Sequence, residues 1–353
     1  MLCKPHMSIG QFAQTLIGVP SDHALYRITR APLCIVFVLV ISCSGRMKSD
    51  VDDHPTDKLL FVDGSYLIID ISGGPDADHY SSRIVDSVPS DLLTNDAYKT
   101  DKIVLRWIPA GTFMMGSPED EIGRDWNAPY EEDRLEINIQ RGFYIGVFEV
   151  TQRQWLNVMG GANPSSFVGD MRPVESVTWN DIRGGKWDDH DAAIIGQGIG
   201  GPFAEDSFAG RLSSRARMLF DLPTEEQWEY AARAGSSAAL TSGQIMTNRQ
   251  RCRHLDVLAR YDANVEAVHG TVGSYKPNAW GLYDVHGNVA ELTVGVKNYH
   301  RHILNYIRHP EYKCMRGGSW NDPAHLCRLA SRQVSSTNYA LNRVGFRIIA
   351  RSE

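Results

Sequence analysis

The last third of this sequence, from Gly235 onward, limits the possible folds most strongly, because it carries very little periodic hydrophobic pattern. Only two short apolar runs, Leu282–Val285 and Val344–Ala350, interrupt it. The chain contains 31 Gly and 8 Trp, so turns are frequent and large side chains are available for a core. Long ordered loops need side-chain hydrogen bonds or a metal ion to satisfy their backbone groups. We therefore expect an irregular, loop-rich α+β fold.

Composition and charge exclude several classes of protein. Hydrophobic residues make up 42% and charged residues 22% of the chain, which is ordinary for a globular protein and rules out disordered, collagen-like and coiled-coil chains. The net charge is −6 and there is no long basic run, which argues against a dedicated nucleic-acid binder. The sequence has no uninterrupted apolar run of about 18 residues, so no membrane-spanning helix is predicted.

The N-terminus has the pattern of an export signal. Arg27 and Arg30 precede a short apolar run, Ala31–Ile41, and a small residue separates this run from Cys43. This order is typical of a secretory signal peptide, and the tetrapeptide VISC that ends at Cys43 resembles a bacterial lipobox. We therefore predict a leader over residues 1–43 and an exported lipoprotein, periplasmic or at the cell surface, with a membrane lipid anchor at Cys43. The alternatives are an uncleaved anchor or a buried strand.

The mature chain divides into two predicted parts. Residues 44–101 are predicted as a polar tether followed by a β-rich N-terminal extension, and residues 102–351 as the main domain. Within the extension, two β-rich runs in Leu59–Ile71 are separated by Asp63-Gly64, which is typical of a β-hairpin.

In the main domain, short β-rich runs and helix-start patterns predict the regular elements. Strands are expected at Ile103–Ile108, Thr112–Gly116, Ile137–Ile139 and Phe143–Val150. Thr151 and Thr224 each precede a Gln by three residues, the capping-box pattern that opens a helix. A short helix is predicted after Thr178 and another over Ser207–Met218.

Eight sequence motifs occur in order along the main domain. They are WIPAGTFMMGSPEDE, FYIGVFEVTQRQW, NPSSF, RPVESVTWNDI, DLPTEEQWEYAARAG, NAWGLYDVHGNVAEL, MRGGSW and VGFRI. Together they resemble the sulfatase-modifying-factor family, also called formylglycine-generating-enzyme-like domains. The resemblance implies one large domain over about Lys102 to Arg351, with a variant of the C-type-lectin fold and little regular secondary structure. This agrees with the α+β fold expected above.

Active members of this family oxidise a sulfatase Cys to formylglycine with oxygen and copper, which two Cys near the C-terminus hold. Thiolates are suited to Cu(I) because both are soft. Counted from Ser319, which matches a residue lining the active site, Asp322 falls at the first Cys and Cys327 at the second. Counted back from Gly345-Phe346-Arg347, Cys327 no longer matches a catalytic Cys. The resemblance thus implies at most Cys327 and Ser319 as catalytic residues.

The other cysteines leave the role of Cys327 open. Of the six Cys in the chain, Cys252, Cys314 and Cys327 remain after processing, and an odd number leaves one thiol free or intermolecular in an oxidising compartment. Cys327 is therefore either a small buried residue or half of a disulfide, with Cys314 as a possible partner. No Cys or His spacing is typical of a zinc site.

The family's calcium motif is better preserved than its copper site. The resemblance places calcium ligands at Asp284, Gly287, Val289 and Glu291. Calcium prefers hard oxygen ligands, and carboxylates mixed with backbone carbonyls suit it. The alternative is a tight turn with surface acids. The resemblance also implies a second calcium site near Asp256 and Asn264.

Two segments near the family's cleft depart from its pattern. Many relatives have two Trp where this chain has Ala290 and Leu292, which alters the cleft wall. Tyr299–His309 adds three His and two Arg, without the spacing of a metal site; it is interpreted as a solvated loop or a positively charged cleft rim.

These observations leave two hypotheses for the function. The first is an exported lipoprotein without oxidase activity, a binding or scaffolding module for a peptide, a glycan or an exported protein. The second is a formylglycine-generating oxidase, and only this second hypothesis requires copper. The Asp at position 322 favours the first hypothesis, because a carboxylate is a hard ligand and binds Cu(I) poorly. Calcium is expected as a structural cofactor in either case.

Overall fold

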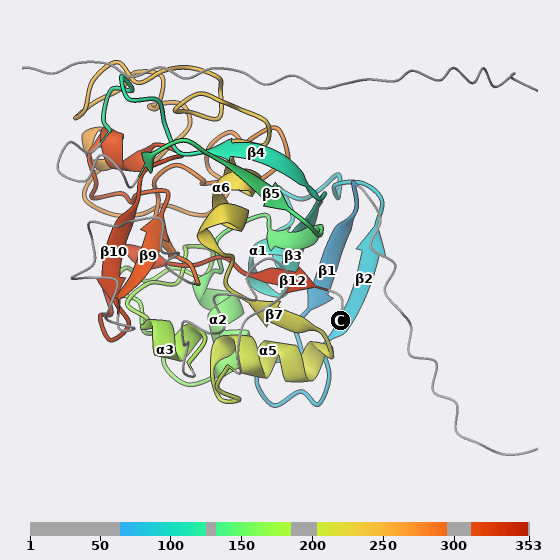
Figure 1. Ribbon diagram of the computed structural model, residues 1–353. Helices are drawn as coiled ribbons and strands as arrows, with labels where there is room; N and C mark the ends of the chain where they lie inside the picture. Colours follow the sequence, from blue (N-terminus) through green and yellow to red (C-terminus); the bar gives the residue numbers. More distant parts are fainter. Residues whose placement is uncertain (1–63, 125–131, 185–202, 295–311, 352–353) are drawn as a thin grey trace, which may run out of the picture. The chain divides into compact units, whose positions relative to one another are not determined.

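The largest sheet joins six strands from distant parts of the chain, in the order β2-β1-β3-β6-β12-β7 (Figure 1). All neighbouring strands in it are antiparallel. The strands are β1 (Tyr66–Asp70), β2 (Ser81–Val85), β3 (Lys102–Ile108), β6 (Phe143–Gly146), β7 (Leu219–Asp221) and β12 (Ile349–Arg351). The late strand β12 lies between β6 and the edge strand β7, so a C-terminal segment is built into this sheet.

This computed structural model describes residues 64–124, 132–184, 203–294 and 312–351. All of them belong to one compact unit, residues 57–353. Two smaller sheets complete its β-structure. One has four strands in the order β10-β9-β8-β11, and the other pairs β4 with β5. Their bounds are β4 (Gly111–Met115), β5 (Leu135–Ile139), β8 (Ala290–Leu292), β9 (Tyr312–Arg316), β10 (Gln333–Ser336) and β11 (Val344–Gly345).

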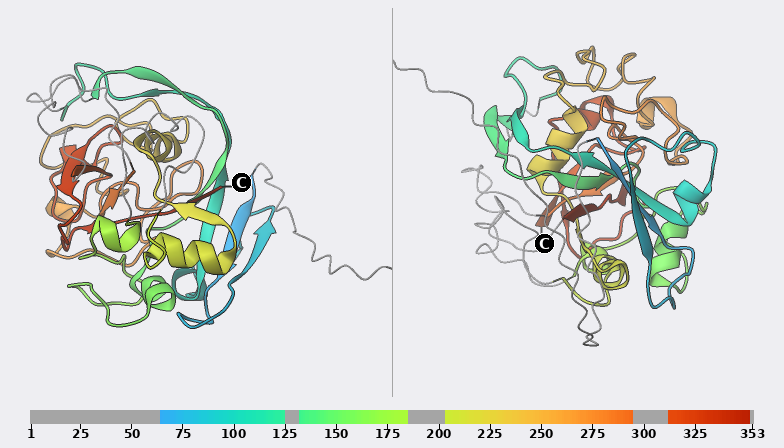
Figure 2. Two further views of the ribbon diagram at one scale, coloured as in Figure 1. Left: turned by 60° about the horizontal axis from the view of Figure 1, so that its bottom comes forward. Right: turned by 90° about the vertical axis from the view of Figure 1, so that its right-hand side faces the viewer.

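The helices are short, and three of the described ones begin where a Thr capping pattern predicts. Thr151, Thr178 and Thr224 each form a reciprocal capping box with the residue three positions later. The helices are α1 (Ala97–Thr100), α2 (Gln152–Met159), α3 (Trp179–Ile182), α5 (Phe208–Ala216) and α6 (Glu225–Arg233). Between α6 and β8 the chain is mostly loop, with one 3-10 turn, η2 (Asp262–Asn264), as the yellow-to-orange part of Figure 2 shows.

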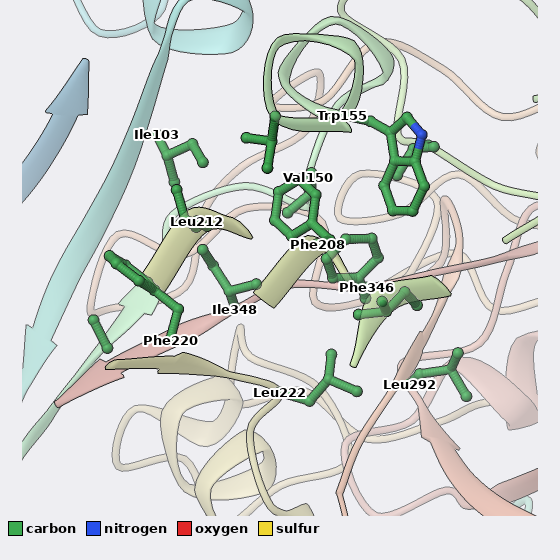
Figure 3. Packing of buried hydrophobic residues seen from close by; sticks show 14 of the residues in the cluster. Ile103, Val150, Trp155, Phe208, Leu212, Phe220, Leu222, Leu292, Phe346 and Ile348 are labelled. Atoms are coloured by element: carbon green, nitrogen blue, oxygen red, sulfur yellow. The ribbon is translucent and has the colours of Figure 1, made fainter. Parts of the chain in front are cut away.

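Aromatic side chains from separate elements form the main core. Trp155 of α2 stacks on Phe208 of α5 with ring centroids 5.5 Å apart, and Phe346, just before β12, meets both rings edge-on (Figure 3). Phe208 and Phe346 are fully buried. Large apolar side chains stabilise a fold mainly by leaving water, so this core holds two helices against the C-terminal segment.

The strands and helices predicted in the main domain are confirmed, except that the strand predicted over Phe143–Val150 ends at Gly146; the loop-rich α+β class is confirmed with them. Residues before 64 lie outside the described part, so the turn at Asp63-Gly64 is not seen in full. The strand β1 pairs with β2 and β3, and the sequence analysis did not identify β2. Two strands from the predicted extension thus belong to the main sheet. None of the described helices combines the length and apolarity needed to cross a bilayer.

Candidate functional site

Two glycine turns bring the family motifs into contact. The amide of Gly287 donates to the carbonyl of Gly317 at 2.9 Å, and the amide of Trp320 donates to the carbonyl of Asn288 at 2.9 Å. Gly318 has φ +69, and a Cβ atom on it would lie 2.7 Å from the Cys327 sulfur. Only glycine fits there without strain, so the Gly-Gly-Ser turn is pressed directly against Cys327.

Asp322 lies at the centre of a polar cluster on this turn, which we call the Asp322 cluster: Ser319, Asp322, Gln333 and Arg343. The Ser319 hydroxyl donates to Asp322 Oδ2 at 2.6 Å, and the Gln333 amide donates to the same oxygen at 3.2 Å. Arg343 Nη1 lies 3.4 Å from it. Ser319 is fully buried and Asp322 almost so. The carboxylate thus has a complete set of donors where the resemblance expects a thiolate.

Cys327 lies at the end of the 3-10 turn η3 (Ala324–Cys327) and is fully buried. Burial, together with the negative charge of Asp322, raises the pKa of its thiol well above the usual range. Such a thiol is protonated at neutral pH and is a poor nucleophile. Cys252, Cys314 and Cys327 are all free and buried, so the possible Cys314–Cys327 disulfide is not formed. Cys314 lies on the strand β9, whereas Cys327 lies on the 3-10 turn η3.

His286 holds the backbone of Cys327 in place. Its Nδ1 lies 2.7 Å from the Cys327 carbonyl, and its Nε2 accepts a hydrogen bond from the Thr241 amide at 3.1 Å. Burial lowers the pKa of the imidazole to about 4. The ring is therefore neutral at physiological pH, with its proton on Nδ1, because only that tautomer satisfies both contacts.

Two of the predicted calcium ligands belong to a buried group of acids. Glu291 accepts hydrogen bonds from Trp228 Nε1 at 2.7 Å and from Arg347 Nε and Nη2, each at 2.5 Å. Asp284 Oδ2 accepts from the Gly273 amide at 2.6 Å. Burial raises the pKa of Asp284 to about 6. Both side chains are buried, so neither is a surface acid in a turn.

Glu149 is a third member of this acid group, and the sequence analysis missed it. Its two oxygens accept hydrogen bonds from the Asn288 side chain at 2.5 Å and from the Val289 amide at 3.0 Å. Burial and the charges of Asp284 and Glu291 raise its pKa well above the usual range. The only signal for Glu149 was its place in FYIGVFEVTQRQW, two residues before the helix cap Thr151.

The acid group fits a divalent cation by charge and by donor type. Three carboxylates, Glu149, Asp284 and Glu291, share one buried guanidinium, that of Arg347, and hard oxygen donors suit calcium. Gly287 has φ +72 and Asn288 φ +61, and the carbonyl of Asn288 already accepts from the Trp320 amide. However, no three His, Cys, Asp or Glu side chains are arranged around a common metal position anywhere in the described residues, and Glu291 is already paired with Arg347.

The remaining predicted site residues have separate places. Asp256 and Asn264 lie near each other, but Asp256 accepts from the Tyr261 hydroxyl at 2.5 Å and Asn264 from the Tyr261 amide at 2.9 Å. Their side-chain oxygens thus accept hydrogen bonds from Tyr261 and stabilise the loop around it. Cys43 and the whole of Tyr299–His309 fall outside the described residues.

Comparison with known proteins points to the same family as the sequence motifs. The chain matches the family described as Sulfatase-modifying factor enzyme 1-like domain over residues 90–352. It is 31% identical to Chaperone protein LppX of Paenibacillus barcinonensis over 210 residues, which cover 50% of this chain and 69% of that protein. It is 31% identical to Inactive C-alpha-formylglycine-generating enzyme 2 of Bos taurus over 278 residues, with coverage of 68% and 85%.

An enzyme is also among the relatives. The chain is 24% identical to Formylglycine-generating enzyme of Mus musculus over 281 residues, which cover 69% of this chain and 74% of the enzyme. Among solved structures, PvdO from Pseudomonas aeruginosa superposes with a TM-score of 0.54 at 22% identity, over 70% of this chain and 94% of that one. This structural likeness shows the fold alone. Since the family match spans most of the chain, we conclude that it belongs to the sulfatase-modifying-factor family.

Proposed function

We propose that this protein is a member of the family without oxidase activity, and that it acts as an exported binding module for a polypeptide. One observation carries the proposal: Asp322, which falls at the family's first copper-binding Cys when counted from Ser319, is held inside the Asp322 cluster. The carboxylate there is held by Ser319, Gln333 and Arg343. The position thus holds a buried carboxylate with polar donors around it, and not a soft thiolate ligand.

The remaining thiol supports the same interpretation. Copper binding in the family needs two thiolates at close range, and Cys327 offers one thiol that is protonated and covered by Gly318. Thiolate, not thiol, is the form that binds metals and reacts. Two relatives also favour a role without oxidation, one named inactive and one named a chaperone protein. The second name is our reason to favour a polypeptide over a glycan as the ligand.

We predict no aldehyde formation on a sulfatase-type Cys-x-Pro-x-Arg peptide, even with copper and oxygen supplied. The physical reason is that Asp322 cannot replace a soft thiolate. Mass spectrometry of the peptide after incubation measures the outcome, with an active family enzyme as the positive control. Conversion of the peptide Cys to formylglycine, lost in Cys327→Ser, would establish the oxidase instead; Cys252, which shares an apolar cluster with Cys327, would then be the candidate second thiol.

We also propose that calcium binds at the predicted ligands Asp284, Gly287, Val289 and Glu291, with Glu149 adding to the negative charge around them. The excess of buried carboxylates over Arg347 supports this proposal. A bound divalent cation would neutralise the charge of these buried carboxylates. The carboxylates would in turn orient the backbone turn at Gly287.

Removal of calcium is expected to lower the melting temperature. A ligand that binds only the folded state stabilises it by about 2.7 kcal/mol at a hundredfold excess over its dissociation constant. Differential scanning fluorimetry with and without a chelator measures the shift, with calcium added back as the control. Asp284→Asn is the better test variant, because Glu291 also holds Arg347. An unchanged melting temperature in chelator would exclude the calcium site.

Export with a lipid anchor is the last part of the proposed function. It rests on the basic flank, the apolar run and the tetrapeptide ending at Cys43. Radiolabelled palmitate fed to the producing bacterium is expected to label the wild type and not Cys43→Ala, because only a thiol at that position accepts the lipid. Cys252→Ala is the matched control and should label normally. Equal labelling of the wild type and Cys43→Ala would refute the lipobox.

A further inference from the structure

Arg343 is the member of the Asp322 cluster that reaches solvent. Its side chain is 27% exposed, whereas that of Asp322 is 9% exposed. Its Nη1 donates to Gln333 Oε1 at 3.2 Å and lies 3.5 Å and 3.4 Å from the two Asp322 oxygens. In the described part of the chain, its Nε and Nη2 have no partner. The nitrogen Nη1 therefore faces the buried part of the Asp322 cluster, whereas Nε and Nη2 remain without a partner among the described residues.

A comparison with Arg347 shows that the contact between Arg343 and Asp322 is not a closed salt bridge. Arg347 is 1% exposed and meets both oxygens of Glu291 at 2.5 Å. Arg343 reaches Asp322 through Nη1 alone, at distances beyond the roughly 2.7–2.9 Å of strong charge-assisted hydrogen bonds. Asp322 already has the Ser319 hydroxyl at 2.6 Å. Arg343 therefore keeps most of its capacity to bind a second carboxylate.

The backbone around Arg343 is fixed from two sides. Its carbonyl accepts a hydrogen bond from the Ala290 amide of β8 at 2.9 Å. The carbonyl of the preceding residue, Asn342, accepts from the Trp320 indole at 3.2 Å. Gln333 orients the guanidinium itself. A side chain that is held in one place loses little conformational freedom on binding, so more of each contact appears as affinity.

We propose that Arg343 is the anchor for an acidic residue of the bound polypeptide, whose side-chain carboxylate pairs with the free nitrogens of the guanidinium. This inference rests on the proposed binding function and names its ligand class. A planar guanidinium matches a carboxylate through two parallel hydrogen bonds, which a lysine cannot do. Asp322 disfavours a second carboxylate placed beside it, so the ligand approaches from the exposed side of Arg343.

The test uses two capped pentapeptides, Gly-Ser-Glu-Ser-Gly and Gly-Ser-Gln-Ser-Gly, titrated into the isotope-labelled full chain and followed by NMR at the arginine Nε signals. We expect the Glu peptide to shift the Arg343 signal and to bind about ten times more tightly than the Gln peptide, since hydrogen bonds to charged groups contribute about 1.5–3 kcal/mol. Arg343→Gln should erase this preference. Arg343→Lys should restore part of it.

Arg251 supplies the matched control. It also lies 3.4 Å from a carboxylate, that of Asp256, and is 66% exposed, so Arg251→Gln should keep the preference for the Glu peptide. A preference that survives in Arg343→Gln, or an Arg343 signal that the Glu peptide does not move, would overturn the inference. Tighter binding of glucuronate than of the Glu peptide would show a glycan ligand and would also overturn it. The aldehyde assay is independent of these results, so failure here leaves the absence of oxidase activity to be judged separately.

Discussion

Replacing Arg347 with methionine is expected to lower the free energy of unfolding by about 3–5 kcal/mol, because it leaves buried carboxylates without their cation. Arg347 pairs with Glu291 through two nitrogens, and it also donates to the carbonyls of Gly146 and Tyr283 at 3.0 Å and 2.9 Å. The variant would lose all of these contacts at once. Urea unfolding followed by tryptophan fluorescence measures the change.

Two further variants separate the buried charge from the loss of the side chain. Arg347→Met/Glu291→Gln removes one charge of each sign, so it should be more stable than Arg347→Met alone. Arg251→Met breaks an exposed ion pair and should change the free energy of unfolding by less than about 1 kcal/mol. A single variant Arg347→Met as stable as the wild type would mean that the acid group does not depend on this guanidinium.

Local patterns in the sequence predict the strands β3 to β6 and the helices α2, α3, α5 and α6, but not the strands β7 to β10. The capping boxes at Thr151 and Thr224 mark helix starts because they involve only residues three positions apart. The signal for the strand β3 is also local, since its β-rich run ends at Pro109-Ala110-Gly111. In contrast, β2 carries no strong apolar alternation, and its place is set by pairing with β1. A strand of that kind is defined by its partner and not by its own residues.

The candidate site was predictable only in part, for the same reason. The resemblance located Ser319, Asp322 and Cys327 because they lie within one short segment. Glu149 meets Asn288 across 139 residues of sequence, and Arg343 meets Asp322 across 21. These contacts exist only because β8 lies between β9 and β11 and brings the loops together. The exposed cation of the cluster, Arg343, was therefore missed, although its central carboxylate, Asp322, was found.

His286 is expected to make the protein sensitive to mild acid. The unfolded chain binds a proton on this residue near pH 6.5, whereas burial lowers its pKa in the folded protein to about 4. Between these values the unfolded state binds more protons, so stability falls as the pH falls. The full difference amounts to about 3 kcal/mol, lost between pH 6.5 and pH 4. Protonation of Nε2 would also remove the acceptor that the Thr241 amide uses.

The variant His286→Asn should remove this acid sensitivity. An asparagine can still donate to the Cys327 carbonyl, but it does not titrate. The stability advantage of the wild type over His286→Asn is therefore expected to shrink by about 3 kcal/mol between pH 7 and pH 4, measured by urea unfolding at several pH values. His254→Asn is the matched control, since the ring of His254 lies at the surface beside the Ile245 carbonyl, and it should follow the wild-type slope. Parallel curves for the wild type and His286→Asn would show that the imidazole is not held neutral, and the hydrogen bonds assigned to it at Cys327 and Thr241 would then have to be revised.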